Sequence, residues 1–122
     1  MLEEPIAMDK YALFVFNGDM SCFIHVLLNA LDLKERGHEV RIVLEGSATK
    51  LIPELSREGT PLFRLYRRAR EQDLIHGTCR ACSMKMNVVK AAEEEGLSLL
   101  DDMSGHPSMG LYLERGFQII TF

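Results

Sequence analysis

Two of the three cysteines of this sequence, Cys79 and Cys82, form a C-x-x-C motif in the segment LIHGTCRACSMKM. Two thiols at this spacing can exchange a disulfide, carry sulfur as a persulfide, supply half of a metal site, or pack as small apolar residues. The motif follows a short apolar run and precedes a segment with helical character. We therefore expect Cys79 to lie at the junction between a strand and a helix.

A cysteine at such a junction is favoured as a thiolate. The first backbone N–H groups and the positive end of the helix dipole face the sulfur, which lowers the pKa of a thiol. Arg80 adds a positive charge next to Cys79 in the chain. We therefore expect Cys79 to be an ionised nucleophile, with Cys82 one turn along to resolve a disulfide or pass sulfur on.

The composition limits the class of protein. A chain of 122 residues that is 47% hydrophobic has the length of one domain with one core. The balance of 14 Lys and Arg against 18 Asp and Glu argues against nucleic-acid binding and against a basic membrane-binding surface. YALFVF is too short for a signal peptide or a membrane span, so we expect a cytoplasmic protein. In that compartment, three cysteines indicate thiol or metal chemistry.

The remaining sequence alternates strand and helix patterns after a short N-terminal extension, residues 1–9. Strands are predicted at 11–16, 38–46, 73–77, 97–100 and 116–122, and helices at 20–36, 47–57, 60–72, 81–96 and 107–115. This order predicts a single α/β domain over residues 10–122, with a mostly parallel five-stranded sheet and helices on both of its faces.

In a parallel sheet, the loops that leave the carboxyl ends of the strands meet at one edge, where ligands usually bind. All three cysteines are expected at this edge. The polar and thiol residues of these loops are Asn17, Asp19, Cys22, Glu45, Ser47, His76, Cys79, Cys82, Ser104 and His106.

Three alternatives to sulfur transfer, namely a zinc site, a thioredoxin-type active site and a nucleotide-binding loop, are weakly supported. A zinc site needs four ligands, and the sequence lacks a second C-x-x-C or an H-x-x-x-H, although Cys22, His76 and His106 could contribute from separate loops. We therefore assign no metal ligand. A thioredoxin-type active site would follow the first strand of a different sheet topology, and FNGDMS lacks the glycine pattern of a nucleotide-binding loop. Sulfur transfer through a cysteine persulfide remains.

The order of these motifs resembles the DsrE/DsrF-like family of small sulfur-relay proteins. The resemblance rests on VFNGD, GHEVRIVLEG, GTCRAC and RGFQIITF, and covers nearly the whole chain from about Lys10. It implies a three-layer flavodoxin-like sandwich, a homotrimer or homohexamer, and sulfur carried as a persulfide on Cys79 with Cys82 assisting. It also implies sulfur donor and acceptor proteins as partners and no cofactor.

Six further residues are predicted to bind substrate beside the two cysteines: Asn17, Asp19, Cys22, His76, Arg80 and His106. Purely structural roles remain open for Cys22 as a small core residue, for His76 at a strand end and for His106 in a loop. The alternative function is a homo-oligomeric regulatory module whose cysteines bind metal or sense oxidants without transferring sulfur.

Overall fold

The computed structural model describes residues 7–122 and contains one five-stranded sheet. The strands are β1 (Lys10–Val15), β2 (Glu39–Leu44), β3 (Ile75–Cys79), β4 (Ser98–Leu100) and β5 (Phe117–Thr121), in the order β4-β3-β2-β1-β5. Every pair of neighbouring strands is parallel. The predicted fold, a single-domain three-layer flavodoxin-like sandwich, is thereby confirmed. Residues 1–6 of the predicted N-terminal extension lie outside the described residues.

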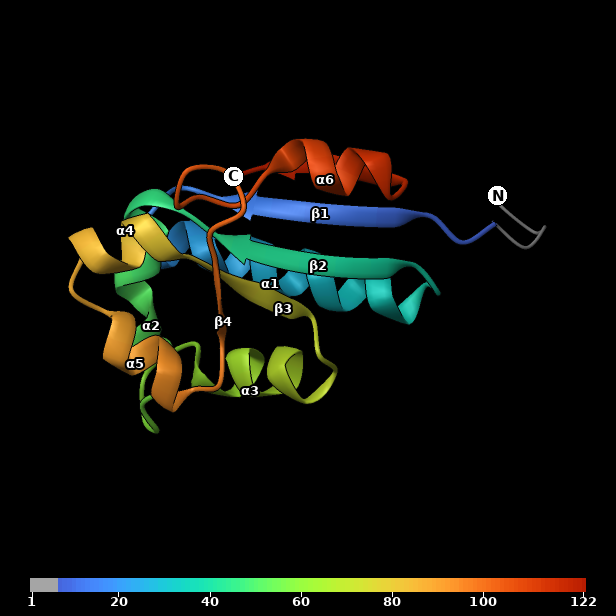
Figure 1. Ribbon diagram of the computed structural model, residues 1–122. Helices are drawn as coiled ribbons and strands as arrows, with labels where there is room; N and C mark the ends of the chain where they lie inside the picture. The colour runs from blue at the N-terminus through green and yellow to red at the C-terminus, as the bar shows by residue number, and fades with distance from the viewer. Residues whose placement is uncertain (1–6) are drawn as a thin grey trace.

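The chain direction explains where the helices lie. Right-handed crossovers from β1 through β2 and β3 to β4 all move the same way across the sheet, so their helices share one face. The return from β4 to β5 runs the other way and places its helix on the opposite face. Figure 1 shows α6 (Met109–Glu114) on one side of the sheet, with α1 (Met20–Glu35) and α3 (Phe63–Glu71) on the other.

The two faces carry cores of unequal size. The larger core lies between the sheet and the helices of the first face, and includes Leu13, Phe23, Ile42 and Tyr66. The smaller core, under α6, consists of five residues: Ala12, Phe14, Val43, Tyr112 and Phe117. Among residues 7–122, α6 is the only helix on this second face, and a six-residue helix cannot cover five strands. Part of the sheet is therefore left open beside it.

Two of the predicted helices differ from the structure. The segment 47–57 forms a 3-10 helix, η1 (Gly46–Leu51), followed by one turn of α-helix, α2 (Ile52–Leu55). The predicted helix over 81–96 is divided into α4 (Arg80–Lys85) and α5 (Val89–Glu94). Asn87 adopts a φ of 58°, while Val88 N–H donates to the carbonyl oxygen of Ser83. This arrangement is a Schellman-type helix end, which stops α4 after less than two turns.

None of the helices formed by the described chain combines the length and the apolar character needed to cross a lipid bilayer.

Candidate functional site

Four side chains meet at the carboxyl edge of the sheet, on the side where α4 lies in Figure 1. They belong to Glu45, Cys79, Cys82 and His106, and each offers one donor atom within 4.8 Å of the others. Glu45 follows β2, the cysteines lie at the end of β3 and in α4, and His106 comes from the loop between β4 and α6. Three connections that are far apart in the sequence thus form one thiol–imidazole–carboxyl cluster.

Cys79 lies at the predicted junction, but its environment differs from the prediction. It is the last residue of β3 and the N-cap of α4, and its Sγ accepts a hydrogen bond from Cys82 N–H at 3.3 Å. Its side chain is fully buried. Burial, assisted by the neighbouring Cys82 and Glu45, raises the pKa of the Cys79 thiol to about 12. The prediction of an ionised, exposed thiolate is therefore wrong. Desolvation raises the pKa by more than the N–H groups of the short helix lower it.

Cys82 is the more accessible of the two thiols. Its side chain is partly exposed, whereas that of Cys79 is closed off from solvent, and both cysteines are free. Cys82 Sγ lies 3.9 Å from His106 Nδ1. A molecule that approaches the site would therefore meet the sulfur of Cys82 first.

His106 lies next to all three of the other residues of the cluster. Its Nδ1 lies 3.1 Å from Cys79 Sγ and 3.8 Å from Glu45 Oε1. The loop that carries it is fixed by backbone hydrogen bonds, from Met103 N–H to the His106 carbonyl oxygen at 2.8 Å and from Ala81 N–H to the Gly105 carbonyl oxygen at 2.9 Å. The second bond connects the loop directly to the first turn of α4. The imidazole is therefore held against both sulfurs.

Glu45 is the member of the cluster to which the sequence analysis gave no role. Its residue is buried, and burial is the largest cause that raises the pKa of its carboxyl group, partly offset by Cys79 and His106. A glutamate that follows a strand and precedes a glycine usually belongs to an exposed turn. Only its position at the same sheet edge as the cysteines could have predicted that Glu45 belongs to the cluster.

Arg80 faces a different partner from the one expected. Its guanidinium donates to Asp101 Oδ2 at 3.1 Å, and both side chains are about half exposed. The pair connects α4 to the beginning of the loop that carries His106. Arg80 therefore contributes to the position of this loop, and its charge is directed away from Cys79.

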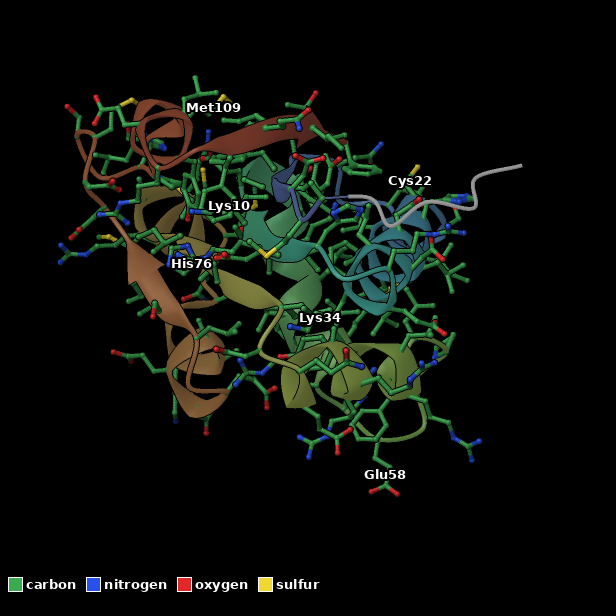
Figure 2. All side chains as sticks on the ribbon, turned by 90° about the vertical axis from the view of Figure 1, so that its right-hand side faces the viewer. Lys10, Cys22, Lys34, Glu58, His76 and Met109 are labelled. Carbon is green, nitrogen blue, oxygen red and sulfur yellow. The ribbon has the colours of Figure 1, made fainter. Side chains whose placement is uncertain are left out.

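Asn17, Asp19 and Cys22 form a separate network at the start of α1. Asp19 is the N-cap, and its Oδ1 accepts from Ser21 N–H at 2.9 Å. Hydrogen bonds from Ser21 lower the pKa of this carboxyl group. Asn17 Nδ2 lies 3.6 Å from Cys22 Sγ. Cys22 lies on α1 (Figure 2) and is not part of the cluster around His106.

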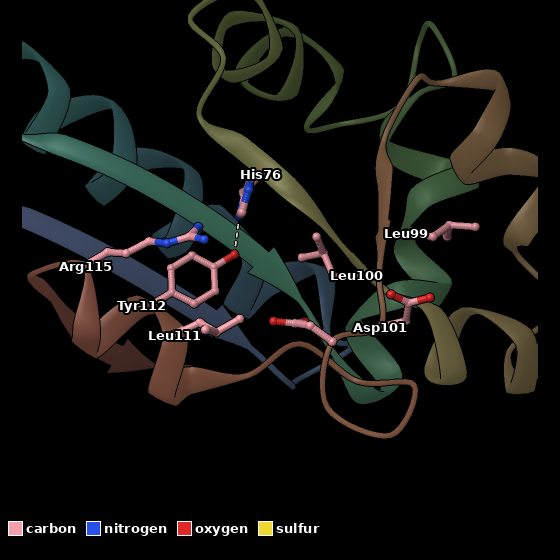
Figure 3. Close-up of a pocket in the computed structure, with 8 residues that line it drawn as sticks. His76, Leu99, Leu100, Asp101, Leu111, Tyr112 and Arg115 are labelled. Carbon is pink, nitrogen blue, oxygen red and sulfur yellow. Dashed lines mark hydrogen bonds between the residues drawn. The ribbon is translucent and has the colours of Figure 1, made fainter.

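His76 lies away from the cluster. It is the second residue of β3, so the prediction that it follows this strand is wrong. Its imidazole is hydrogen-bonded to the Tyr112 hydroxyl, as Figure 3 shows, and lies 3.5 Å from Arg41 Nη1. His76 and Tyr112 both line a pocket of about 300 Å³ beside α6. The sequence did not predict this pocket, because β3 was predicted two residues too early and the open face depends on the tertiary structure.

Comparison with known proteins finds relatives of this chain in two archaea, and the names of these relatives assign no activity to them. It is 35% identical over 102 residues to uncharacterized protein MJ0733 of Methanocaldococcus jannaschii, covering 84% of this chain and 81% of that protein. An uncharacterized protein of Archaeoglobus fulgidus is 40% identical over 58 residues, covering 48% of this chain and 93% of that protein. The chain belongs to the same family as the Methanocaldococcus protein. No protein-family model matches the sequence, and no solved structure matches it significantly.

Proposed function

We propose that this protein is a sulfur carrier of the DsrE/DsrF type, which holds sulfane sulfur as a persulfide on Cys79 and passes it to a partner protein with the help of Cys82. The observation that supports this proposal best is the position of His106 Nδ1, which lies 3.1 Å from Cys79 Sγ and 3.9 Å from Cys82 Sγ. One imidazole nitrogen can thus exchange protons with both thiols.

The burial of the two cysteines assigns them different steps. Cys82 is partly exposed and receives the sulfur: its thiolate attacks the outer sulfur of a donor persulfide, and the donor leaves as a thiolate. Cys82 then carries the persulfide. Cys79 is out of the reach of a donor protein but adjacent to Cys82, so it takes the sulfur in a second, internal step.

The internal step needs a base because the Cys79 thiol is protonated at neutral pH. With the ring proton on Nε2, His106 Nδ1 accepts the Cys79 proton while the sulfur attacks the terminal sulfur of the Cys82 persulfide. The bond between Cys82 and the sulfane sulfur breaks, and the Cys82 thiolate takes the proton back from His106. The sulfane sulfur has moved from Cys82 to Cys79, and a proton has moved from Cys79 to Cys82. No external oxidant or reductant is consumed.

Glu45 and the surrounding surface fit the same role. The Glu45 carboxyl group lies 3.8 Å from the nitrogen that becomes charged, and so stabilises the imidazolium. Met84 in α4 and Met103 in the His106 loop are exposed by 61% and 51%. Exposed methionines adapt to differently shaped surfaces, as a carrier that meets both a donor and an acceptor protein requires.

The test is sulfur loading followed by mass spectrometry. The protein is incubated with a persulfide-forming desulfurase, and each cysteine variant is scored for the added mass of one sulfur atom. We expect Cys82→Ser to load slowly or not at all. Cys79→Ser should load on Cys82 but lose its sulfur rapidly to small thiols, because the buried position is missing. Cys22→Ser is the matched control and should behave as the unaltered protein.

Two results would contradict the proposal. One is loading on Cys22 alone. The other is a protein that forms a reversible disulfide between Cys79 and Cys82 but never gains sulfur, which would indicate a thiol oxidoreductase.

A further inference from the structure

The donor atoms of the cluster have the chemistry and spacing of a tetrahedral metal site. Zinc bound by Cys, His and Glu has bonds of about 2.0 to 2.3 Å, so neighbouring ligand atoms lie about 3.3 to 3.8 Å apart. The distances from His106 Nδ1 are 3.1 Å to Cys79 Sγ, 3.9 Å to Cys82 Sγ and 3.8 Å to Glu45 Oε1. All four atoms lie within 4.8 Å of one another, so small side-chain shifts would bring them to bonding positions around one ion.

A single proton or lone pair on His106 Nδ1 cannot satisfy all of its neighbours in the cluster, and a cation could bind them together. His106 Nδ1 carries either one proton or one lone pair, yet it faces two thiols and a carboxylate at once. Glu45 is buried, and among the ion pairs of the described chain its partner is His106 and no lysine or arginine. Buried charges in proteins are paired with a fixed charge or coordinate a metal.

The supporting contacts are those of a preorganised site. Cys82 N–H donates to Cys79 Sγ at 3.3 Å, which stabilises a sulfur that carries negative charge. The Ala81 N–H bond to Gly105 and the Arg80–Asp101 pair hold the His106 loop against α4. The two segments that supply three of the four ligands are thus tied together without the ion.

We propose that Glu45 Oε1, Cys79 Sγ, Cys82 Sγ and His106 Nδ1 form a tetrahedral site for a thiophilic divalent cation, with zinc as the ion that this donor set favours. Binding releases the two thiol protons to solvent and forms four metal–ligand bonds. Because all four positions are filled by protein, the site is of the structural or regulatory kind. An ion bound there occupies both sulfurs and makes them unavailable to a persulfide donor.

Cobalt titration of the metal-free protein tests the site directly. Co²⁺ substitutes for zinc, and tetrahedral cobalt bound to thiolates absorbs in the near-ultraviolet and visible regions. We expect this absorption to saturate at one ion per chain and to disappear on addition of zinc. Zinc should also raise the melting temperature, since the four ligands are brought together only in the folded chain, which therefore binds the ion more tightly than the unfolded chain does.

Two ligand variants test the site further, and a third variant is the control. His106→Ala removes a ligand whose side chain is 42% exposed, so the variant should fold, and its affinity for cobalt should fall by at least the roughly 10- to 100-fold that loss of a supporting group costs. Glu45→Gln should weaken binding while the cobalt–thiolate absorption persists. Cys22→Ser should bind as the unaltered protein does.

Two outcomes would overturn the inference. The first is the absence of cobalt–thiolate absorption from the unaltered chain. The second is an unchanged affinity in His106→Ala or Glu45→Gln, which would place the ion elsewhere. The titration contains no sulfur donor, so its failure is distinguishable from failure of the proposed sulfur transfer.

Discussion

At the scale of single residues, burial distinguishes the two thiols: Cys79 is buried and Cys82 is partly exposed. A cysteine at the beginning of a helix ordinarily has a lowered pKa, but α4 has only six residues, and the Cys79 side chain is closed off from water. The same desolvation raises the pKa of Glu45 beside it. Burial thus disfavours the charged forms of both Cys79 and Glu45.

His76 provides a pH-dependent property that is separate from the cluster. Burial, followed by the positive charges of Arg41 and Arg115, lowers its pKa below the ordinary value of 6.5. Acid therefore protonates the unfolded chain first, so the contribution of His76 to stability is lost as the pH falls below about 6.5.

We expect His76→Gln to reduce the loss of unfolding free energy between about pH 7.5 and pH 5, measured by urea denaturation. Tyr112→Phe keeps the imidazole and should retain the pH dependence, at a lower stability because its hydroxyl bond to His76 is lost. An identical pH profile in His76→Gln and the unaltered protein would show that other histidines cause the effect.

At the scale of the elements, the close approach of β4 to β3 positions the His106 loop. Gly77 in β3 makes this approach possible, because a Cβ at this position would lie 2.6 Å from the Ser98 carbonyl oxygen and 2.9 Å from Leu100 Cγ, both in β4. β4 has only three residues and pairs with β3 alone. A larger residue at position 77 would therefore displace β4 and the loop that follows it.

Gly77→Ala is expected to destabilise the protein by about 1 to 3 kcal/mol, as overpacking at a close contact does. It should also weaken cobalt binding, since His106 moves with its loop. Gly110→Ala in α6 is the matched control: its Cβ would meet only Ser108 Oγ at 3.4 Å, and alanine favours a helix by about 0.5 to 1 kcal/mol. Equal stability of the two variants in urea denaturation would refute the role of Gly77.

The sequence predicts those features that depend on local pattern. The apolar runs of β1 and β2 and the stripe of α1 predict the parallel sheet and the edge at which Cys79, Cys82 and His106 lie. The break at Asn87 is a single residue in a left-handed conformation, which no periodicity reveals. The burial of Cys79 and Glu45 depends on a loop that arrives from beyond β4, so it follows only from the tertiary structure.

At the scale of the whole molecule, the free edge of the sheet at β5 is the surface where we expect a second copy of the chain to bind. β5 is an edge strand that pairs only with β1. Ile120 on this strand is 40% exposed and lies beside Leu13 on the face of the sheet away from α6, and Leu113 on α6 is 58% exposed. Unpaired edges with apolar side chains favour association, so the homotrimer or homohexamer that the DsrE/DsrF resemblance implies stays a prediction that this edge makes testable.

We expect light scattering to give three or six times the monomer mass at micromolar concentration. Ile120→Lys should shift the protein toward the monomer, because a charge would then be buried in the contact. Leu28→Lys, on the outer side of α1 and 46% exposed, is the control and should leave the assembly unchanged. A monomer in the unaltered protein would exclude the oligomer.

The three connections that form the cluster also determine when its chemistry can begin. Glu45, the cysteine pair and His106 come together only after β2, β3 and β4 have paired, so a chain still emerging from the ribosome has no assembled cluster. During synthesis the thiols of Cys79 and Cys82 are ordinary exposed groups that oxidants and stray metal ions reach freely. Completion of the fold buries Cys79, leaves Cys82 partly exposed, and brings both thiols next to His106 and Glu45.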